Sequence, residues 1–293
     1  MSDLAVVVEK YSFLEGPRWH DGRIWFSDFY THQVVSADEH GGDLRVEAQV
    51  PAQPSGLGWL PDGRLLIVSM RDHRLLRREP DGALSVHADV SSHAGGLLND
   101  MVVDSRGRTW VGNFGFDLMA GAPIAPAPLV RVDPDGSSTV ASEPLHFPNG
   151  AVITGNTMIV NETFGHRISA FEIDADGGLS ERRDWASFGP VPATTDVGEA
   201  LGQLSVAPDG MCLDAEGAVW IADALGNRAL RVREGGEVLQ ELSTGDTGVY
   251  AVALGGADGR TLFLCTAPGF AEHERRHTRE AKLLAARVDV PGA

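Results

Sequence analysis

Basic residues are scarce in this chain of 293 residues, which has 24 Lys and Arg against 41 Asp and Glu and a formal net charge of −17. A field of that sign repels nucleic-acid phosphates and anionic lipid surfaces, so we expect neither a nucleic acid nor a membrane as a partner. Solubility alone explains such acidity, although part of the charge could also gather around a cation.

Long apolar runs are also missing. No stretch reaches the roughly 20 apolar residues that span a bilayer, and the segment from Met1 to Leu4 has no basic region of a secretory signal. The only two cysteines, Cys212 and Cys265, stand in apolar segments that we expect to be buried strands. Two buried thiols suit a reducing compartment, and the sequence does not argue for a disulfide. We therefore expect a cytoplasmic protein.

Several chemical signatures are absent as well. The sequence has no Cys/His spacing of a structural zinc site. It also has no G-x-S-x-G elbow and no Ser-His-Asp order, which argues against a serine esterase. No helical pattern of any length competes with short apolar segments separated by turns, and we therefore expect an all-β chain.

What the sequence does contain is a unit that recurs six times. Each unit starts with a short apolar segment, continues through a tight Gly turn into a second apolar strand, and then through polar turns into third and fourth strands. Self-similarity at a period of roughly 40–50 residues, built from strands and turns, is typical of β-propeller blades. The six units begin at Glu15-Gly16, Ser55-Gly56, Asn99-Asp100, Asn149-Gly150, Asp209-Gly210 and Tyr250-Ala251.

We predict a six-bladed β-propeller with four-stranded blades, forming a single domain over residues 1–293. The last unit ends with its third strand, 283–288. We expect residues 5–8 to supply the missing fourth strand, which would close the ring and protect an open sheet edge. Two long segments, 187–208 and 267–281, should lie on the face where the units begin and shape a pocket there, unless they are merely tolerated insertions.

The first position of the unit collects oxygen side chains. At the heads of the innermost strands, Glu15, Asn99, Asn149 and Asp209 would offer two carboxylates and two amide oxygens to one point. Paired carboxylates in a narrow channel need a cation or a proton, and all-oxygen ligation favours Ca²⁺, or Mg²⁺ and Mn²⁺ in a small cavity. Asp-Gly and Asn-Gly are also ordinary turn dipeptides, but turns do not require their coincidence at one repeat position.

Four motifs spread across essentially the whole chain carry a resemblance to a known family. They are Leu14-Glu15-Gly16-Pro17-Arg18-Trp19, Leu98-Asn99-Asp100, Phe147-Pro148-Asn149-Gly150 and Pro208-Asp209-Gly210-Met211-Cys212-Leu213-Asp214. In this order they resemble the regucalcin (senescence marker protein)/gluconolactonase/luciferin-regenerating-enzyme-like family. The resemblance implies a six-bladed propeller with one divalent cation in its central channel. It implies Glu15, Asn149 and Asp209 as ligands, with Asn99 either ligating or holding substrate. Ca²⁺ is the favoured ion, with Mg²⁺, Mn²⁺, Zn²⁺ and Fe²⁺ as alternatives.

Because members of this family are mainly lactonases, the resemblance implies a metal-dependent hydrolase that opens a lactone or related ester. The cation would polarise the carbonyl, and Asp209 could take a proton from the attacking water. Asp100 is the alternative base, or else a supporting residue or turn cap.

One departure from the family bears on the substrate. Sugar-lactone members carry an arginine two residues before the Asn of the N-D motif, where this chain has Leu97. With aromatic residues on the same face, this points to a more apolar lactone or ester rather than a simple sugar lactone. The further expected substrate-binding residues are Phe29, Phe114, Phe116, Phe164 and His146, the last of them near the rim of the metal site.

Two other functions stay open from the sequence. The same oxygen site could serve a fluorophosphatase-type phosphotriester hydrolase, or the chain could be a non-catalytic cation-binding propeller. We expect a monomer or a small homo-oligomer whose partner is a small-molecule lactone or ester.

Overall fold

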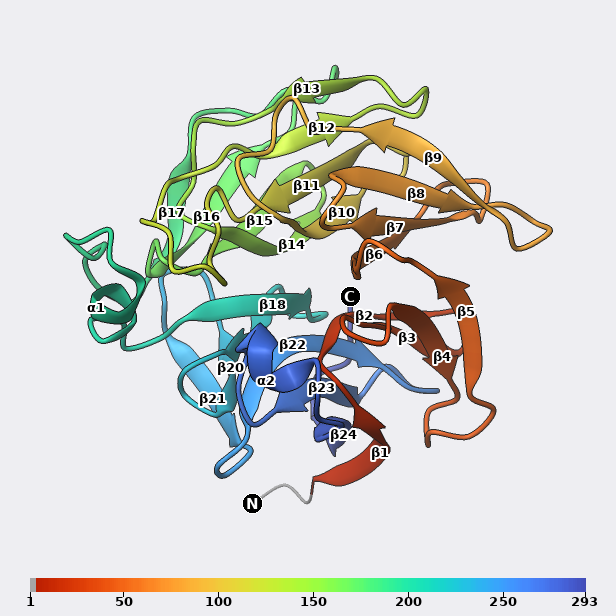
Figure 1. Ribbon diagram of the computed structural model, residues 1–293. Helices are drawn as coiled ribbons and strands as arrows, with labels where there is room; N and C mark the ends of the chain where they lie inside the picture. Colours follow the sequence, from red (N-terminus) through yellow and green to blue (C-terminus); the bar gives the residue numbers. More distant parts are fainter. Residues whose placement is uncertain (1–3) are drawn as a thin grey trace. The chain divides into compact units, whose positions relative to one another are not determined.

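The computed structural model describes residues 4–293 (Figure 1). Six four-stranded antiparallel sheets make the fold an all-β six-bladed propeller, as predicted. The chain divides into two compact units, one from Met1–Pro54 with Asp209–Ala293 and the other from Ser55–Pro208. We call them unit 1 and unit 2 and describe each by itself. The single domain expected over residues 1–293 stays a prediction.

Unit 1 contains blades 1, 5 and 6. Blade 1 comprises β2 (Leu14–His20), β3 (Arg23–Asp28), β4 (Gln33–Ala37) and β5 (Arg45–Gln49). Blade 5 comprises β18 (Pro208–Leu213), β19 (Val219–Asp223), β20 (Arg228–Val232) and β21 (Val238–Ser243). Blade 6 comprises β22 (Gly248–Gly255), β23 (Thr261–Ala267), β24 (Ala281–Arg287) and β1 (Ala5–Tyr11).

Unit 2 contains blades 2, 3 and 4. Blade 2 comprises β6 (Pro54–Trp59), β7 (Leu65–Ser69), β8 (Arg74–Arg78) and β9 (Leu84–Asp89). Blade 3 comprises β10 (Leu98–Val103), β11 (Thr109–Asn113), β12 (Val130–Val132) and β13 (Ser138–Val140). Blade 4 comprises β14 (Pro148–Thr154), β15 (Thr157–Glu162), β16 (Arg167–Glu172) and β17 (Arg183–Ser187).

The N-terminal strand completes the last blade, as the sequence predicted. β1 runs antiparallel to β24, with Ala5 opposite Ala285 and Tyr11 opposite Ala281, and the red and blue strands lie side by side in Figure 1. This pairing covers the edge of β24 that the chain would otherwise leave open.

The predicted Gly turns and second strands are also confirmed. The glycines of the six turns between first and second strands adopt φ values from 57° to 84°, a region open to glycine at little cost. Each turn leads into a strand that is buried on both faces. Trp110 of β11 and Trp220 of β19 are fully buried and centre apolar clusters within unit 2 and unit 1 respectively.

The long segments contain structure that the sequence pattern did not predict. Two short helices occur there, α1 (Val197–Leu201) and α2 (Glu272–Arg275), each of them too short to show a helical period. Both thiols are free, and Cys265 is buried as expected, whereas Cys212 is partly exposed because it lies where β18 leaves the interior. Among residues 4–293, no helix is long and apolar enough to cross a membrane.

Candidate functional site

The repeat position predicted from the sequence is a structural position. Glu15, Ser55, Asn99, Asn149 and Asp209 are each the second residue of their blade's first strand, and Tyr250 is the third residue of β22. All six side chains are buried to at least nine-tenths. Polar side chains therefore occupy the same place in five successive blades, where a core would ordinarily hold apolar groups.

A register shift marks this position in four blades. The pairing of first and second strands slips after Glu15, across Asn99, across Asn149 and across Tyr250. Such bulges leave a residue out of the ladder and turn its side chain away from the regular alternation. The bulges therefore change the direction of the side chain near the start of each of these first strands. The sequence pattern gave no sign of them.

In unit 1, the charges of Glu15 and Asp209 both act on Tyr250 and on Cys265. Burial raises the pKa of the Tyr250 phenol, and the charges of Asp209 and Glu15 raise it further, while Arg275 acts in the opposite direction. Burial likewise raises the pKa of the Cys265 thiol, to which Glu15 and Asp209 also add. Both carboxylates are buried, at 8% and 9% exposure.

A cation fits this pair. A carboxylate that is held out of water loses hydration, and an ion that takes up its oxygens offsets that loss. Among residues 4–293, no three His, Cys, Asp or Glu side chains gather as they would around a metal. The set predicted from the sequence needs only these two carboxylates, because its other two ligands are amides.

Arg275 is a charged residue of this region that sequence reasoning missed. It is 5% exposed, belongs to α2 in the long segment 267–281, and lowers the pKa of Tyr250. Its Nη1 donates to Glu280 Oε2 at 3.1 Å, whereas its buried Nε has no hydrogen-bond partner within residues 4–293. The length of the segment was the available signal, but nothing in the sequence distinguished this arginine from its neighbours.

In unit 2, hydrogen bonds fix the orientation of both amides. Asn99 Nδ2 donates to the Pro148 carbonyl oxygen at 3.4 Å. Asn149 Nδ2 donates to Thr163 Oγ1 at 3.2 Å, and that hydroxyl donates its own hydrogen to the Pro208 carbonyl oxygen at 2.8 Å. A carbonyl can only accept, and the Thr163 hydrogen is already used, so each amide must present its nitrogen to these partners. Its oxygen therefore faces the other way, as a ligand oxygen would.

The two carbonyl acceptors, of Pro148 and Pro208, belong to the residues just before the next proposed ligands along the chain. Pro148 immediately precedes Asn149, and Pro208 immediately precedes Asp209. Thr163, which follows β15, was not among the residues predicted from the sequence, because its role depends on a partner 45 residues away. It is a positioning residue that ties the amide of blade 4 to Pro208, the last residue of unit 2.

The predicted aromatic residues of unit 2 form one packed cluster. Phe114 stacks on Phe147 with centroids 4.4 Å apart, and Phe116 and Phe164 pack against the same ring at 5.9 and 5.4 Å. Phe147 has φ = 63°, a left-handed conformation that is unfavourable for a bulky residue. The cluster holds it there, directly before Pro148-Asn149. Phe29 lies in unit 1 instead and packs on Phe13, which contacts Tyr250.

The remaining predicted residues also lie in unit 2. Asp100 is 7% exposed, and its Oδ1 accepts a hydrogen bond from the Met101 amide at 2.8 Å. Gly56 packs so closely on it that a Cβ there would lie 2.6 Å from the same oxygen. Leu97 is half-buried, and its carbonyl oxygen accepts from the Phe114 amide. His146 is half-buried beside Glu162.

Glu162 is a buried carboxylate that the sequence did not single out. Burial opposes its ionisation, but hydrogen bonds from His146, Arg167 and Ser169 outweigh burial and lower its pKa to about 2. Arg167 pairs with both oxygens, at 2.8 and 3.0 Å, and the His146 amide donates to Oε2 at 2.8 Å. Arg167, its cationic partner, belongs to the same blade.

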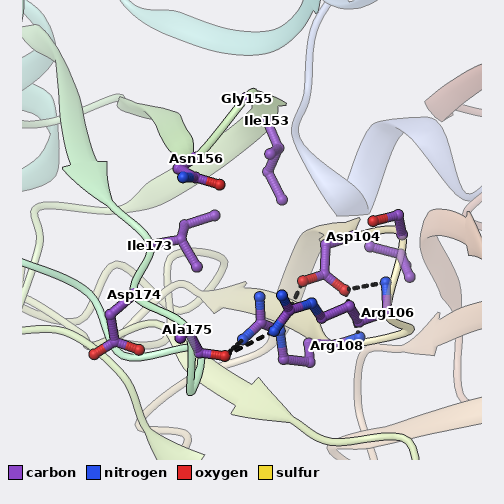
Figure 2. Close-up of a pocket in the computed structure, with 11 residues that line it drawn as sticks. Asp104, Arg106, Arg108, Ile153, Gly155, Asn156, Ile173, Asp174 and Ala175 are labelled. Carbon is purple, nitrogen blue, oxygen red and sulfur yellow. Dashed lines mark hydrogen bonds and ion pairs between the residues drawn. The ribbon is translucent and has the colours of Figure 1, made fainter.

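A cavity of about 520 Å³ in unit 2 lies away from these residues (Figure 2). It is lined by the turns that follow β10 and β14, at the opposite ends of those strands from Asn99 and Asn149. Arg106 Nη1 and Arg108 Nη1 both donate to the Ala175 carbonyl oxygen there, and Arg108 Nε donates to Asp104. Because both arginines donate to protein acceptors, we assign these hydrogen bonds a role in joining blade 3 to the turn that follows β16 of blade 4.

Comparison with known proteins identifies the family of the chain. Residues 13–268 match the family model described as SMP-30/Gluconolactonase/LRE-like region. Pentonolactonase XacC of Haloferax volcanii is 27% identical over 87% of this chain and 81% of its own. The 6-deoxy-6-sulfogluconolactonase of Pseudomonas putida is 25% identical over 99% of this chain and 96% of its own.

Among solved structures, a calcium-binding protein, regucalcin, from Agrobacterium tumefaciens superposes with a TM-score of 0.79, covering 100% of this chain and 96% of its own at 21% identity. That likeness supports the fold. The family model extends from before β2 into blade 6 and includes all four predicted ligand positions. The chain belongs to the SMP-30/gluconolactonase/LRE-like family.

Proposed function

We propose that the protein is a divalent-cation-dependent hydrolase that opens a lactone or a related ester. The observation that carries the proposal is the burial of Glu15 and Asp209 at the same position of their blades' first strands, in a chain of this family. Two relatives matched over most of their length are named as lactonases. Ca²⁺ is the ion we propose first, since the four proposed ligands, Glu15, Asn99, Asn149 and Asp209, are all oxygen donors.

In the proposed chemistry, the cation and Asp209 have separate tasks. A bound cation would act as a Lewis acid on the carbonyl of the scissile ester. Asp209 would accept a proton from the attacking water as the water oxygen bonds to the carbonyl carbon. The ring C–O bond then breaks, and the same proton passes to the departing alkoxide, which completes hydrolysis without any further reagent.

Asn99 and Asn149 would contribute neutral oxygens that need no compensating charge. Their hydrogen-bonded amide nitrogens keep those oxygens oriented before the ion arrives, which lowers the entropic cost of binding it. Asp100 remains the alternative base. Its contact with the Met101 amide and the tight approach of Gly56 favour a supporting role, because both hold its carboxylate in place.

We further propose that the substrate is more apolar than a sugar lactone. Leu97 offers no hydrogen bond where an arginine was expected from sugar-lactone relatives, and the neighbouring aromatic cluster is apolar. The test is a panel of gluconolactone, dihydrocoumarin and alkyl lactones, assayed with chelator-stripped protein restored ion by ion. Hydrolysis of gluconolactone as fast as the apolar lactones would contradict the substrate proposal. Fluoride release from a fluorophosphate, without lactone hydrolysis, would contradict the lactonase proposal.

A further inference from the structure

A second cavity of unit 2, of about 200 Å³, has no role in the function proposed so far. Its walls come from four separate segments of the chain, and most of the side chains are apolar. The principal lining residues are Ile124, Pro126, His146, Phe164, Val191 and Pro192. Pockets for whole small ligands usually measure about 300–1,000 Å³, so a cavity of this size suits a substituent.

The walls of this cavity are held in place by hydrogen bonds. The Ile124 amide donates to the Thr195 carbonyl oxygen at 2.8 Å, which joins two of the four segments. The Ser205 amide donates to His166 Nε2 at 3.1 Å, so the ring hydrogen must be on Nδ1, and this nitrogen donates to the Pro190 carbonyl oxygen at 3.2 Å. One buried histidine thus fixes both ends of the segment between Pro190 and Ser205.

His146 supplies the polar edge of the cavity. Its backbone amide is bound to Glu162, while its ring Nδ1 lies 3.7 Å from Glu162 Oε2, too far for a hydrogen bond. That buried Nδ1 has no hydrogen-bond partner among residues 4–293. The imidazole therefore stands between a carboxylate that is already saturated by Arg167 and Ser169 and the open space of the cavity.

Phe164 connects the cavity to the proposed metal ligands. Its ring lines the cavity and packs on Phe147, the residue before Pro148-Asn149. Thr163, the residue before Phe164, accepts the hydrogen bond from Asn149. A group in the cavity would therefore lie beside Phe164, whose neighbour in the chain, Thr163, is hydrogen-bonded to the proposed ligand Asn149.

We propose that this cavity is a subsite for a short alkyl substituent on the ring of the lactone. The inference rests on the proposed function, because it assumes that the ester lies near Asn149. Burial of each additional methylene should lower the KM about fourfold until the cavity is filled. Longer chains should then bring no further gain.

The experiment measures kcat and KM for γ-lactones with side chains lengthened one methylene at a time. Wild-type protein should show the fourfold steps and then a plateau. Ala193→Phe, which places a ring in the cavity wall, should flatten this dependence. Gln203→Phe adds the same ring to an exposed position of the same segment outside the cavity, and it should leave the steps unchanged.

A second measurement separates the subsite from the catalytic proposal. 1-Hexanol is titrated into protein with ¹³C-labelled methyl groups, and the Ile124 and Val191 signals should shift in wild type but not in Ala193→Phe. Hydrolysis of all lactones at equal KM, without these shifts, would overturn the subsite alone. Absence of lactone hydrolysis together with these shifts would overturn the catalytic proposal and leave the subsite. Absence of both would overturn both.

Discussion

The two compact units treat their polar residues in different ways. Unit 1 holds Glu15 and Asp209, two buried charges whose influence meets at Tyr250. Unit 2 holds Asn99 and Asn149, two neutral amides whose nitrogens are already hydrogen-bonded. Both units also contain buried carboxylates paired with arginine, such as Glu162 with Arg167 in unit 2 and Asp214 with Arg231 in unit 1.

The difference separates two requirements of a cation site. Charge in unit 1 supplies the attraction for the cation, at the cost of removing the carboxylates from water. Order in unit 2 supplies oriented oxygens, and its hydrogen bonds stabilise the fold whether or not an ion is bound. Substitutions in unit 1 should therefore affect function more than stability, and substitutions in unit 2 should affect stability as well.

The largest effect is expected from Asp209→Asn. Loss of a ligand charge and of the proposed base should reduce lactone hydrolysis by on the order of a thousandfold, which corresponds to about 4 kcal/mol. The rise in Tm on adding Ca²⁺ should disappear, while the Tm in chelator should equal or exceed that of wild type. Asp246→Asn, at an exposed position of unit 1, controls for the change of charge. A large drop of Tm in chelator would contradict the separation of the two requirements.

Glu162→Gln should instead lower the free energy of unfolding by about 3 kcal/mol at pH 7, because it leaves the partly buried Arg167 without its charged partner. The folded-state pKa of about 2 lies below the ordinary 4.5, so this stabilisation is present above pH 4.5 and is lost as the pH falls toward 2. Denaturant unfolding at several pH values measures it. Glu172→Gln, at the exposed end of β16, is the control, and an equal effect from it would contradict the argument.

Thr163→Val tests whether the hydrogen bonds of unit 2 serve the cation. The substitution keeps the shape of the side chain and removes the link between Asn149 and the Pro208 carbonyl, so Ca²⁺ affinity should fall about tenfold. Isothermal titration measures the affinity, and Thr163→Ser should restore most of it. An unchanged affinity in the valine variant would show that Asn149 needs no such support.

The smallest effect is expected from Asp100→Asn. If Asp209 is the base, an amide at position 100 still accepts the hydrogen bond from Met101, and kcat should fall less than about tenfold. Steady-state kinetics with saturating Ca²⁺ would show this. A thousandfold loss of kcat with Ca²⁺ affinity intact would assign the base to Asp100 instead.

The strands and turns of this molecule were predictable because they depend on local patterns. Apolar segments and turn glycines such as Gly22 and Gly107 located the first and second strands of each blade. The repeat position of the oxygen side chains also follows from the sequence, and it coincides with the second residue of the first strand in five blades.

The support around those side chains was not predictable. The hydrogen bond from Thr163 to Pro208 joins residues 45 apart, and the bulge at Asn149 depends on the pairing of β14 with β15. Glu162 looks like any charged strand end until Arg167 and Ser169 are seen around it. Such contacts are decided by strand register, which no local pattern of residues specifies.

The pairing of β1 with β24 has a consequence for the order of folding. It joins segments at opposite ends of the sequence, so during synthesis blade 6 stays incomplete until residues 281–287 have left the ribosome. Until then β1 has no strand to pair with, while blades 2, 3 and 4 are built from consecutive residues and can form earlier. The nascent chain should accordingly be most prone to aggregate just before its final strand emerges.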